Sequence, residues 1–179
     1  MALNFTTVKL NLYQWAVTVV PSGMPVIFYN PNAPSPDVAY VTLYLNSIVS
    51  VGQDWSAEDS DITGTIDMKG DRQFTLNVQA YGGDSLTVLE NIRTSLQKQT
   101  VLDTLRANGI AFYQALNISD LTDLVDTQFE SRASLDILFG IAQIYTDTPG
   151  YFDTMEVQEV IQNQEETIVY NQTITITSP

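Results

Sequence analysis

Three charged residues alternate along one stretch of the chain, and they are the first candidates for chemistry. If "FESRASLDILF" forms a strand, Glu130, Arg132 and Asp136 share one face. Paired carboxylates hydrolyse glycosidic bonds when they lie about 5 to 9.5 Å apart. At a rise of about 3.3 Å per residue, Glu130 and Asp136 lie about 20 Å apart. This row alone therefore predicts no active site, and a contact across a subunit boundary explains it better.

A cluster of acids follows another predicted strand, in "DWSAEDSD" (residues 54–61). Loop carboxylates of this kind bind calcium, but the stretch lacks the glycine and the terminal glutamate of an EF-hand loop. The pattern favours a solvated loop without a metal. Trp55 is the unusual member, because an exposed tryptophan is typical of protein interfaces. Trp55 is therefore a candidate for contact with a partner, and packing against the core of its own domain is the alternative.

The sequence "YGGDS" (residues 81–85) lies between a predicted strand and a predicted helix, where anions often bind. It has no lysine, and Asp84 places a negative charge where a phosphate would lie. The pattern therefore favours ordinary capping of the helix by Asp84 or Ser85.

Composition restricts the chemistry further, because the 179 residues include neither histidine nor cysteine. Serine–histidine triads, thiolate catalysis and ordinary zinc sites are thereby excluded. The formal net charge of −14 argues against tight binding of nucleic acid, although an acidic lining would let a duplex slide past. We expect no catalytic set, no metal and no cofactor. The sequence also indicates no signal peptide and no membrane span.

The elements that position these residues follow from hydrophobic periodicity and from turn residues. A helix is predicted near residues 8–19, capped by Thr6 or Thr7, and two more begin near 85 and at Thr100. An acidic connector is expected over 117–128, and exposed loops are expected over 30–37 and over 52–71, the latter with a short strand at 65–68. Strands are predicted over 26–30, 38–51, 72–82, 110–115, 129–139, 155–161 and 167–176. Beyond Phe139 the alternation stops at Gly140, where we expect a bulge or a bend as the strand leaves the sheet.

This order of elements predicts an α+β fold. We expect a mainly antiparallel sheet packed on one side by a helix pair plus the N-terminal helix. Residues 1–150 would form this domain, and residues 151–179 a β-hairpin or arm that belongs to the same domain or to a subunit interface.

Three stretches, in order, resemble a known family. They are "NPNAPSPDVAYVTLYL", "RQFTLNVQAYGGDSLTVLENI" and "ESRASLDILF". An Asn/Pro-rich loop before a Tyr-Val-Thr strand, an aromatic-Gly end before a helix, and a later Glu-x-Arg-Ala strand resemble the phage neck or tail terminator proteins. The resemblance covers roughly residues 5–146.

The resemblance implies a structural virion protein without enzymatic activity. Such a protein would form a homo-oligomeric ring, usually a hexamer, on the head-proximal end of the tail tube. There it would stop tube polymerisation and join the tube to the head connector or adaptor protein, while genome DNA passes through. It would lie in the virion neck, and in the host cytoplasm during assembly. The interface residues that we expect are Glu130, Arg132, Asp136, Trp55, Asn32, Pro34 and Tyr40.

Other functions remain open on the residues alone. The chain would also suit another neck or tail component, such as a connector adaptor. A carboxylate-dependent or calcium-dependent hydrolase and a small ligand-binding domain are the alternatives outside virion assembly.

Overall fold

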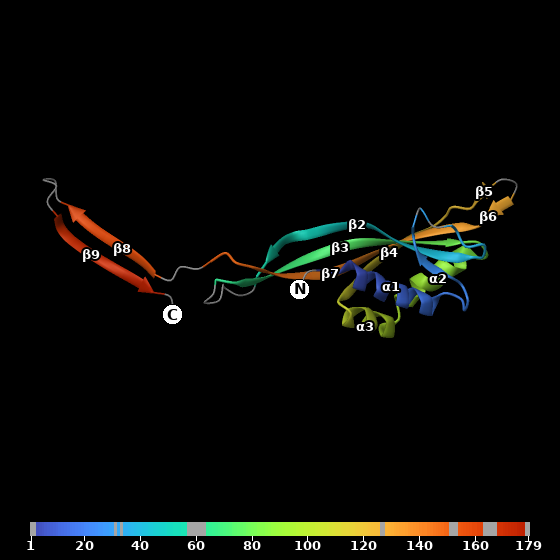
Figure 1. The fold of residues 1–179 in the computed structure, drawn as a ribbon, viewed down its shortest axis with the longest axis horizontal. Coiled ribbons are helices and arrows are strands. Elements are labelled where there is room, and N and C mark those ends of the chain that lie inside the picture. Colours follow the sequence, from blue (N-terminus) through green and yellow to red (C-terminus); the bar gives the residue numbers. More distant parts are fainter. Residues whose placement is uncertain are drawn as a thin grey trace. The chain divides into compact units, whose positions relative to one another are not determined.

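The computed structural model describes residues 3–30, 32, 34–56, 64–125, 128–150, 154–162 and 168–177. The chain forms two compact units (Figure 1). The main unit contains Met1–Trp55 and Lys69–Tyr145, and the second unit contains Ser56–Met68 and Thr146–Pro179. Each unit is described by itself below.

Three helices and nine strands are formed by the described residues. The helices are α1 (Phe5–Val19), α2 (Ser85–Ser95) and α3 (Gln99–Ala107). The strands are β1 (Val26–Phe28), β2 (Tyr40–Trp55), β3 (Ile66–Tyr81), β4 (Ile110–Asp120), β5 (Asp123–Val125), β6 (Gln128–Glu130), β7 (Arg132–Asp147), β8 (Thr154–Gln162) and β9 (Ile168–Thr177).

Five strands form one sheet in the order β1-β2-β3-β7-β4. Strand β1 runs parallel to β2, whereas β2 is antiparallel to β3 and β4 is antiparallel to β7. All three helices lie on one side of this sheet (Figure 1). The predicted α+β fold with a mainly antiparallel sheet is therefore confirmed.

The hydrophobic core lies between the helices and one face of the sheet. Every second residue over 74–80 of β3 and 133–139 of β7 faces it, as the alternation predicted, and all of these are at most 1% exposed: Phe74, Leu76, Val78, Ala80, Ala133, Leu135, Ile137 and Phe139. Phe139 lies at the centre, since its ring packs edge-on against Trp15 of α1 and stacks on Phe74 of β3. Trp15 donates its indole N–H to the buried Ser95 hydroxyl of α2 at 3.1 Å. This hydrogen bond ties α1 to α2 inside the core.

The helix ends show where local patterns succeed and fail. Asp84 caps α2, as predicted, because its carboxylate accepts a hydrogen bond from the Thr87 N–H. Helix α1 begins earlier than expected, since Asn4 rather than a threonine accepts from the Thr6 N–H. Helix α3 begins at Gln99, so Thr100 lies inside the helix and does not cap it.

The strands around the acidic loop are longer than predicted. Strand β2 continues to Trp55 and β3 starts at Ile66, whereas a loop was expected over residues 52–71. Cross-strand pairing extends the strands here, with Trp55 opposite Lys69 beyond an irregularity near Gly52. Residues 57–63, which hold the remaining acids of the expected solvated loop, lie outside the described residues.

The strand that was expected over residues 129–139 is interrupted, and this corrects one prediction. Ser131 belongs to no strand; its carbonyl accepts a hydrogen bond from the Gly82 N–H. Glu130 consequently lies in β6, in a separate two-stranded sheet with β5. The acidic connector is also shorter than predicted, because β4 continues to Asp120.

The break in alternation at Gly140 also has a different cause from the one expected. Strand β7 continues through Gly140 and ends at Asp147. Gly140 and Ile141 pair with Ala111 and Ile110 of β4 without a shift in register. The bulge instead lies in β4, where Tyr113 is the extra residue. A Cβ on Gly140 would overlap the Tyr113 ring, so the glycine makes room for an aromatic side chain from the neighbouring strand.

The second unit contains the hairpin of β8 and β9, which pair antiparallel from Thr154↔Thr177 to Gln162↔Ile168. Both predicted C-terminal strands are thus present. Across the described part of the chain, no helix is long and apolar enough to cross a membrane.

Candidate interface on the open face of the sheet

The helices leave one face of the five-stranded sheet uncovered, and its polar residues line up across three strands. We call this surface the open face. At one end of the sheet it is formed by the residues that alternate with the core residues of β2, β3 and β7: Tyr40, Thr42, Tyr44, Asn77, Gln79, Tyr81, Arg132, Ser134 and Asp136. Tyr40 and Thr42 are themselves buried, so the other seven residues form its accessible part. Tyr40 lies opposite Tyr81, and Thr42 lies opposite Gln79.

A chain of hydrogen bonds runs across the open face. Tyr81 donates its hydroxyl to Gln79 Oε1 at 2.7 Å, and Gln79 Nε2 donates to Asn77 Oδ1 at 2.7 Å. Asn77 Nδ2 then donates to Asp136 Oδ1 at 2.7 Å and to Ser134 Oγ at 2.9 Å. The network fixes the side chains of β3 and β7 relative to each other, which makes a pre-organised surface.

Arg132 lies at one end of this network. It donates from Nη2 and Nε to Gln79 Oε1, at 2.6 and 3.2 Å. Its guanidinium lies over the Tyr81 ring at 5.1 Å, and Tyr81 in turn stacks on Tyr40 with ring centroids 4.6 Å apart. Burial raises the pKa of Tyr81, while the charge of Arg132 opposes that shift. The result is a rigid stack of two tyrosines and an arginine.

Arg132 differs from the other three arginines of the chain in its pairing. Arg72, Arg93 and Arg106 each form an ion pair with a carboxylate of the same subunit. Arg132 has no such partner among the described residues, although the chain holds 21 acidic residues against seven basic ones. A half-buried arginine that is stacked on an aromatic ring and has no carboxylate partner in its own subunit is suited to form an ion pair with a carboxylate of another chain.

The structure brings some of the predicted interface residues together and separates others. Arg132, Asp136 and Tyr40 belong to the open face, although Tyr40 itself is only 8% exposed. Glu130 is exposed on β6, so the prediction that it shares a strand face with Arg132 is wrong. Trp55 is 50% exposed at the other end of β2, with Lys69 Nζ 6.0 Å from its ring.

The remaining two predicted residues, Asn32 and Pro34, are exposed in the segment between β1 and β2. The residues that the sequence did not single out are Asn77, Gln79 and Tyr81. Their alternation predicted a polar strand face, but nothing local predicts that β3 pairs with β7.

A second polar cluster lies at the far end of the same three strands. Arg72 donates to both carboxylate oxygens of Asp54, at 2.7 and 2.6 Å, and Tyr145 donates its hydroxyl to Asp54 Oδ2 at 2.9 Å. The hydrogen bond from Arg72 is the main cause that lowers the pKa of Asp54. A Cβ on Gly70 would overlap this ion pair, so the glycine gives it room. Asp54 is thus a structural residue, and the described residues contain no group of side chains that would hold a metal.

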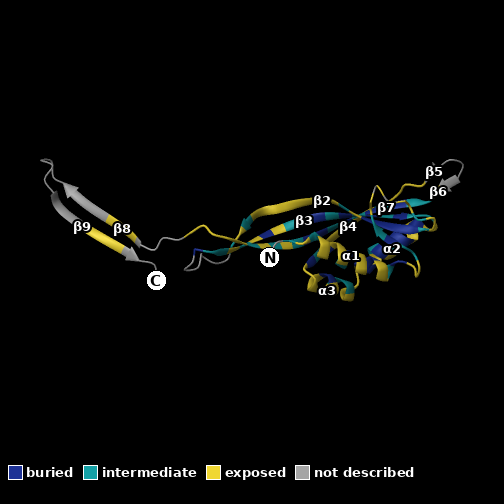
Figure 2. Ribbon diagram, in the orientation of Figure 1, coloured by how far each residue is buried: buried dark blue, intermediate teal, exposed yellow. Residues whose placement is uncertain are grey.

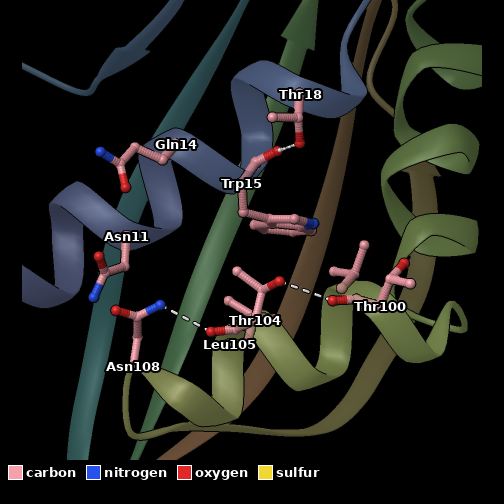
Figure 3. A pocket seen from close by; sticks show the side chains of 9 residues that line it. Asn11, Gln14, Trp15, Thr18, Thr100, Thr104, Leu105 and Asn108 are labelled. Atoms are coloured by element: carbon pink, nitrogen blue, oxygen red, sulfur yellow. Dashed lines mark hydrogen bonds between the residues drawn. The ribbon is translucent and has the colours of Figure 1, made fainter.

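A groove of about 290 Å³ separates α1 from α3 (Figure 3). Figure 3 shows Trp15 of α1 facing Thr104 of α3 across it. The groove is lined by uncharged side chains: Asn11, Gln14, Trp15, Thr18, Thr100, Val101, Thr104, Leu105 and Asn108. None of them is a titratable acid, base or activated nucleophile, so the groove offers no acid–base chemistry.

Comparisons with known proteins address the whole chain. Among solved structures, it is similar to a cryo-EM structure described as an extracellular contractile injection system, PVC sheath/tube terminator in extended state, with 11% identity and a TM-score of 0.42. That match covers 92% of this chain and 65% of the other. No curated protein sequence matches the chain. A family model described as phage neck terminator protein matches residues 8–177. The chain therefore belongs to the phage neck terminator family, and it is a structural component of the virion tail rather than an enzyme.

Proposed function

We propose that this chain assembles into a ring, with a hexamer as the expected size, which caps the head-proximal end of the tail tube. The ring ends polymerisation of the tube protein and presents its opposite surface to the head connector or adaptor protein. The observation that carries this proposal is the family match over residues 8–177, which includes nearly the whole chain.

The open face supports the assembly part of the proposal. A sheet that is covered by helices on one face only leaves its other face for a partner. Here that face carries stacked tyrosines and an arginine that forms no ion pair with the described carboxylates, and Tyr and Arg are among the residue types enriched at interface hot spots. Because the chain has a formal charge of −14, the acid that Arg132 needs is abundant on a second copy.

The same negative charge fits a channel for genome DNA. Acidic walls repel the phosphate backbone, so a duplex passes without binding tightly. The exposed residues Asn32, Pro34 and Trp55 lie in or next to loops, and we assign them to contacts with the tube or with the connector.

Sizing by light scattering tests the proposal. The expected result is a homo-oligomer, either for the protein alone or after addition of purified tail tubes. A strictly monomeric protein under both conditions would overturn it. Calorimetric titration with calcium provides a separate check, and binding of calcium would favour the alternative of a cation-dependent enzyme.

A further inference from the structure

Within the second unit, the side chains described for the C-terminal hairpin are exposed on both of its faces. Met155 and Val157 of β8 are 50% and 44% exposed, and Ile174 of β9 is 46% exposed. The residues that alternate with them, Glu156, Thr173 and Thr175, are exposed as well. A two-stranded hairpin is at best marginally stable in water, and it needs a further strand or a packed layer. This hairpin therefore requires a partner.

The main unit offers a matching strand edge on β2. Strand β1 pairs with β2 only at Val41–Leu43, and from Tyr44 onward no other described strand pairs with that side of β2. Within this free edge, Ser47 to Val51 keep an uninterrupted register with β3 and are all exposed (Figure 2). Ile48, Val49 and Val51 are each about half exposed, at 49%, 51% and 48%.

The segment Ser47–Val51 of this edge lacks the features that normally prevent pairing with another chain. Natural edge strands are short, bulged, or carry charged residues or proline. Residues 44–53 of β2 contain no charged side chain and no proline. Strand β2 is itself irregular between Leu45 and Ser47 and between Val51 and Trp55, but the five residues Ser47–Val51 between these places pair with β3 without interruption. On the opposite edge, the irregularities near Tyr113 and between Ala115 and Ile118 leave no uninterrupted run of β4 longer than three residues. Strand β2 is therefore the edge that is open to a further strand.

We propose that the β8–β9 hairpin of one subunit pairs with the β2 edge of the next subunit and extends its sheet. The donor and the acceptor are different surfaces of the same chain, so the contact is heterologous, and a heterologous contact closes a ring when its rotation permits. The uncharged edge also accepts the acidic hairpin without repulsion. This inference rests on the proposed ring, and it names the segment that links one subunit to the next.

Cross-linking tests the contact directly, because the chain contains no cysteine. One full-length variant carries Ser50→Cys on β2, and another carries Thr173→Cys on β9; both positions are exposed. After mixing and treatment with a short bismaleimide, which tolerates a small error in register, we expect a covalent dimer that neither variant forms alone. Thr104→Cys, at an exposed position of α3, mixed with Thr173→Cys, is the matched control and should give only background.

A second experiment tests the β2 edge without a cross-linker. Val49→Lys places a charge on the free edge, and we expect it to raise the dissociation constant of assembly by about tenfold or more. Val17→Lys on α1, where the side chain is 44% exposed, should leave assembly unchanged. Circular dichroism should show that both variants are folded.

The possible results separate this inference from the proposed ring. An oligomer without the mixed cross-link, or with an unchanged dissociation constant for Val49→Lys, overturns the hairpin contact and leaves the ring. Cross-linking of Ser50→Cys to itself would mean that two β2 edges pair, which also overturns it. In a further variant that carries both Ser50→Cys and Thr173→Cys, cross-linking within one molecule would place the hairpin on its own sheet, which overturns the contact between subunits as well. A monomer in light scattering overturns the ring itself.

Discussion

Arg132 gives the clearest test of the open face, because replacing it by glutamate should affect assembly more than folding. Within the subunit, Arg132 contributes one cation–π contact and two hydrogen bonds to a single amide oxygen. The cation–π contact stabilises by about 0.5 to 1 kcal/mol at a partly exposed site. The two hydrogen bonds share one acceptor oxygen, so we count them as a single bond from a charged donor. Such a bond contributes about 1.5 kcal/mol at the lower end of its range, which is appropriate for a half-exposed group that water can replace.

The expected loss of folding free energy is therefore about 2 kcal/mol, against a total of about 5 to 15 kcal/mol for an ordinary domain. For a chain of this size, that loss lowers the Tm by about 4 to 8 °C, so Arg132→Glu stays folded at room temperature. At the interface, an arginine that anchors a partner is worth about 2 kcal/mol or more, which corresponds to at least a roughly 30-fold increase in the dissociation constant.

The assay measures assembly by light scattering over a range of protein concentrations, with circular dichroism on the same samples. Arg106→Glu is the matched control, because it makes the same change in charge at a side chain that is 59% exposed on α3. We expect Arg132→Glu to weaken assembly with unchanged circular dichroism, and Arg106→Glu to assemble normally. An unchanged dissociation constant for Arg132→Glu would refute the role in assembly, and a parallel loss of circular dichroism would make Arg132 a folding residue.

Three further predictions concern the stability of the main unit. Phe139→Ala should lower the free energy of unfolding in urea by about 3 to 5 kcal/mol, while Leu10→Ala, at a side chain that is 52% exposed, should change it by no more than about 0.5 kcal/mol; equal effects would contradict the assigned core. Ser95→Ala should cost about 1 to 3 kcal/mol because it leaves the buried Trp15 indole N–H without its acceptor, and Ser119→Ala on the exposed side of β4 is the control that should be neutral. Because the pKa of Asp54 is lowered in the folded protein, its contribution to folding stability is fully present above its ordinary pKa of 3.8 and is lost as the pH falls through the folded-state pKa. The difference in Tm between the natural protein and Asp54→Asn should therefore be largest near neutral pH and should shrink below about pH 4. A difference in Tm that stays constant down to about pH 2 would contradict the ion pair with Arg72.

The sequence predicted those parts of the fold that depend on local periodicity. Alternation in β3 and β7 identified the core faces, for example Leu76 and Leu135, because a side-chain period of two persists wherever one face is buried. The cap of α2 was also predictable, since Asp84 acts on a backbone group only three residues away.

The parts that sequence analysis missed depend on contacts between distant residues. Glu130 and Arg132 appeared to share a strand face. The Gly82 N–H, however, donates a hydrogen bond to the carbonyl of Ser131, and the strand is interrupted at that residue. Arg72 binds Asp54 across 18 residues, and that contact follows only from the β2–β3 register. Gln79, the hydrogen-bond partner of Arg132, is 53 residues away in the sequence. The sequence therefore predicted a polar face for each strand separately but not that these faces form one surface.

Electron microscopy of purified tail tubes, incubated with this protein and then supplied with fresh tube subunits, tests the central claim most directly. The account predicts a ring-shaped density at one end of each tube, and no further growth from that end. Growth from both ends at the rate seen without the protein, with no density at either end, would contradict the assignment of a capping role.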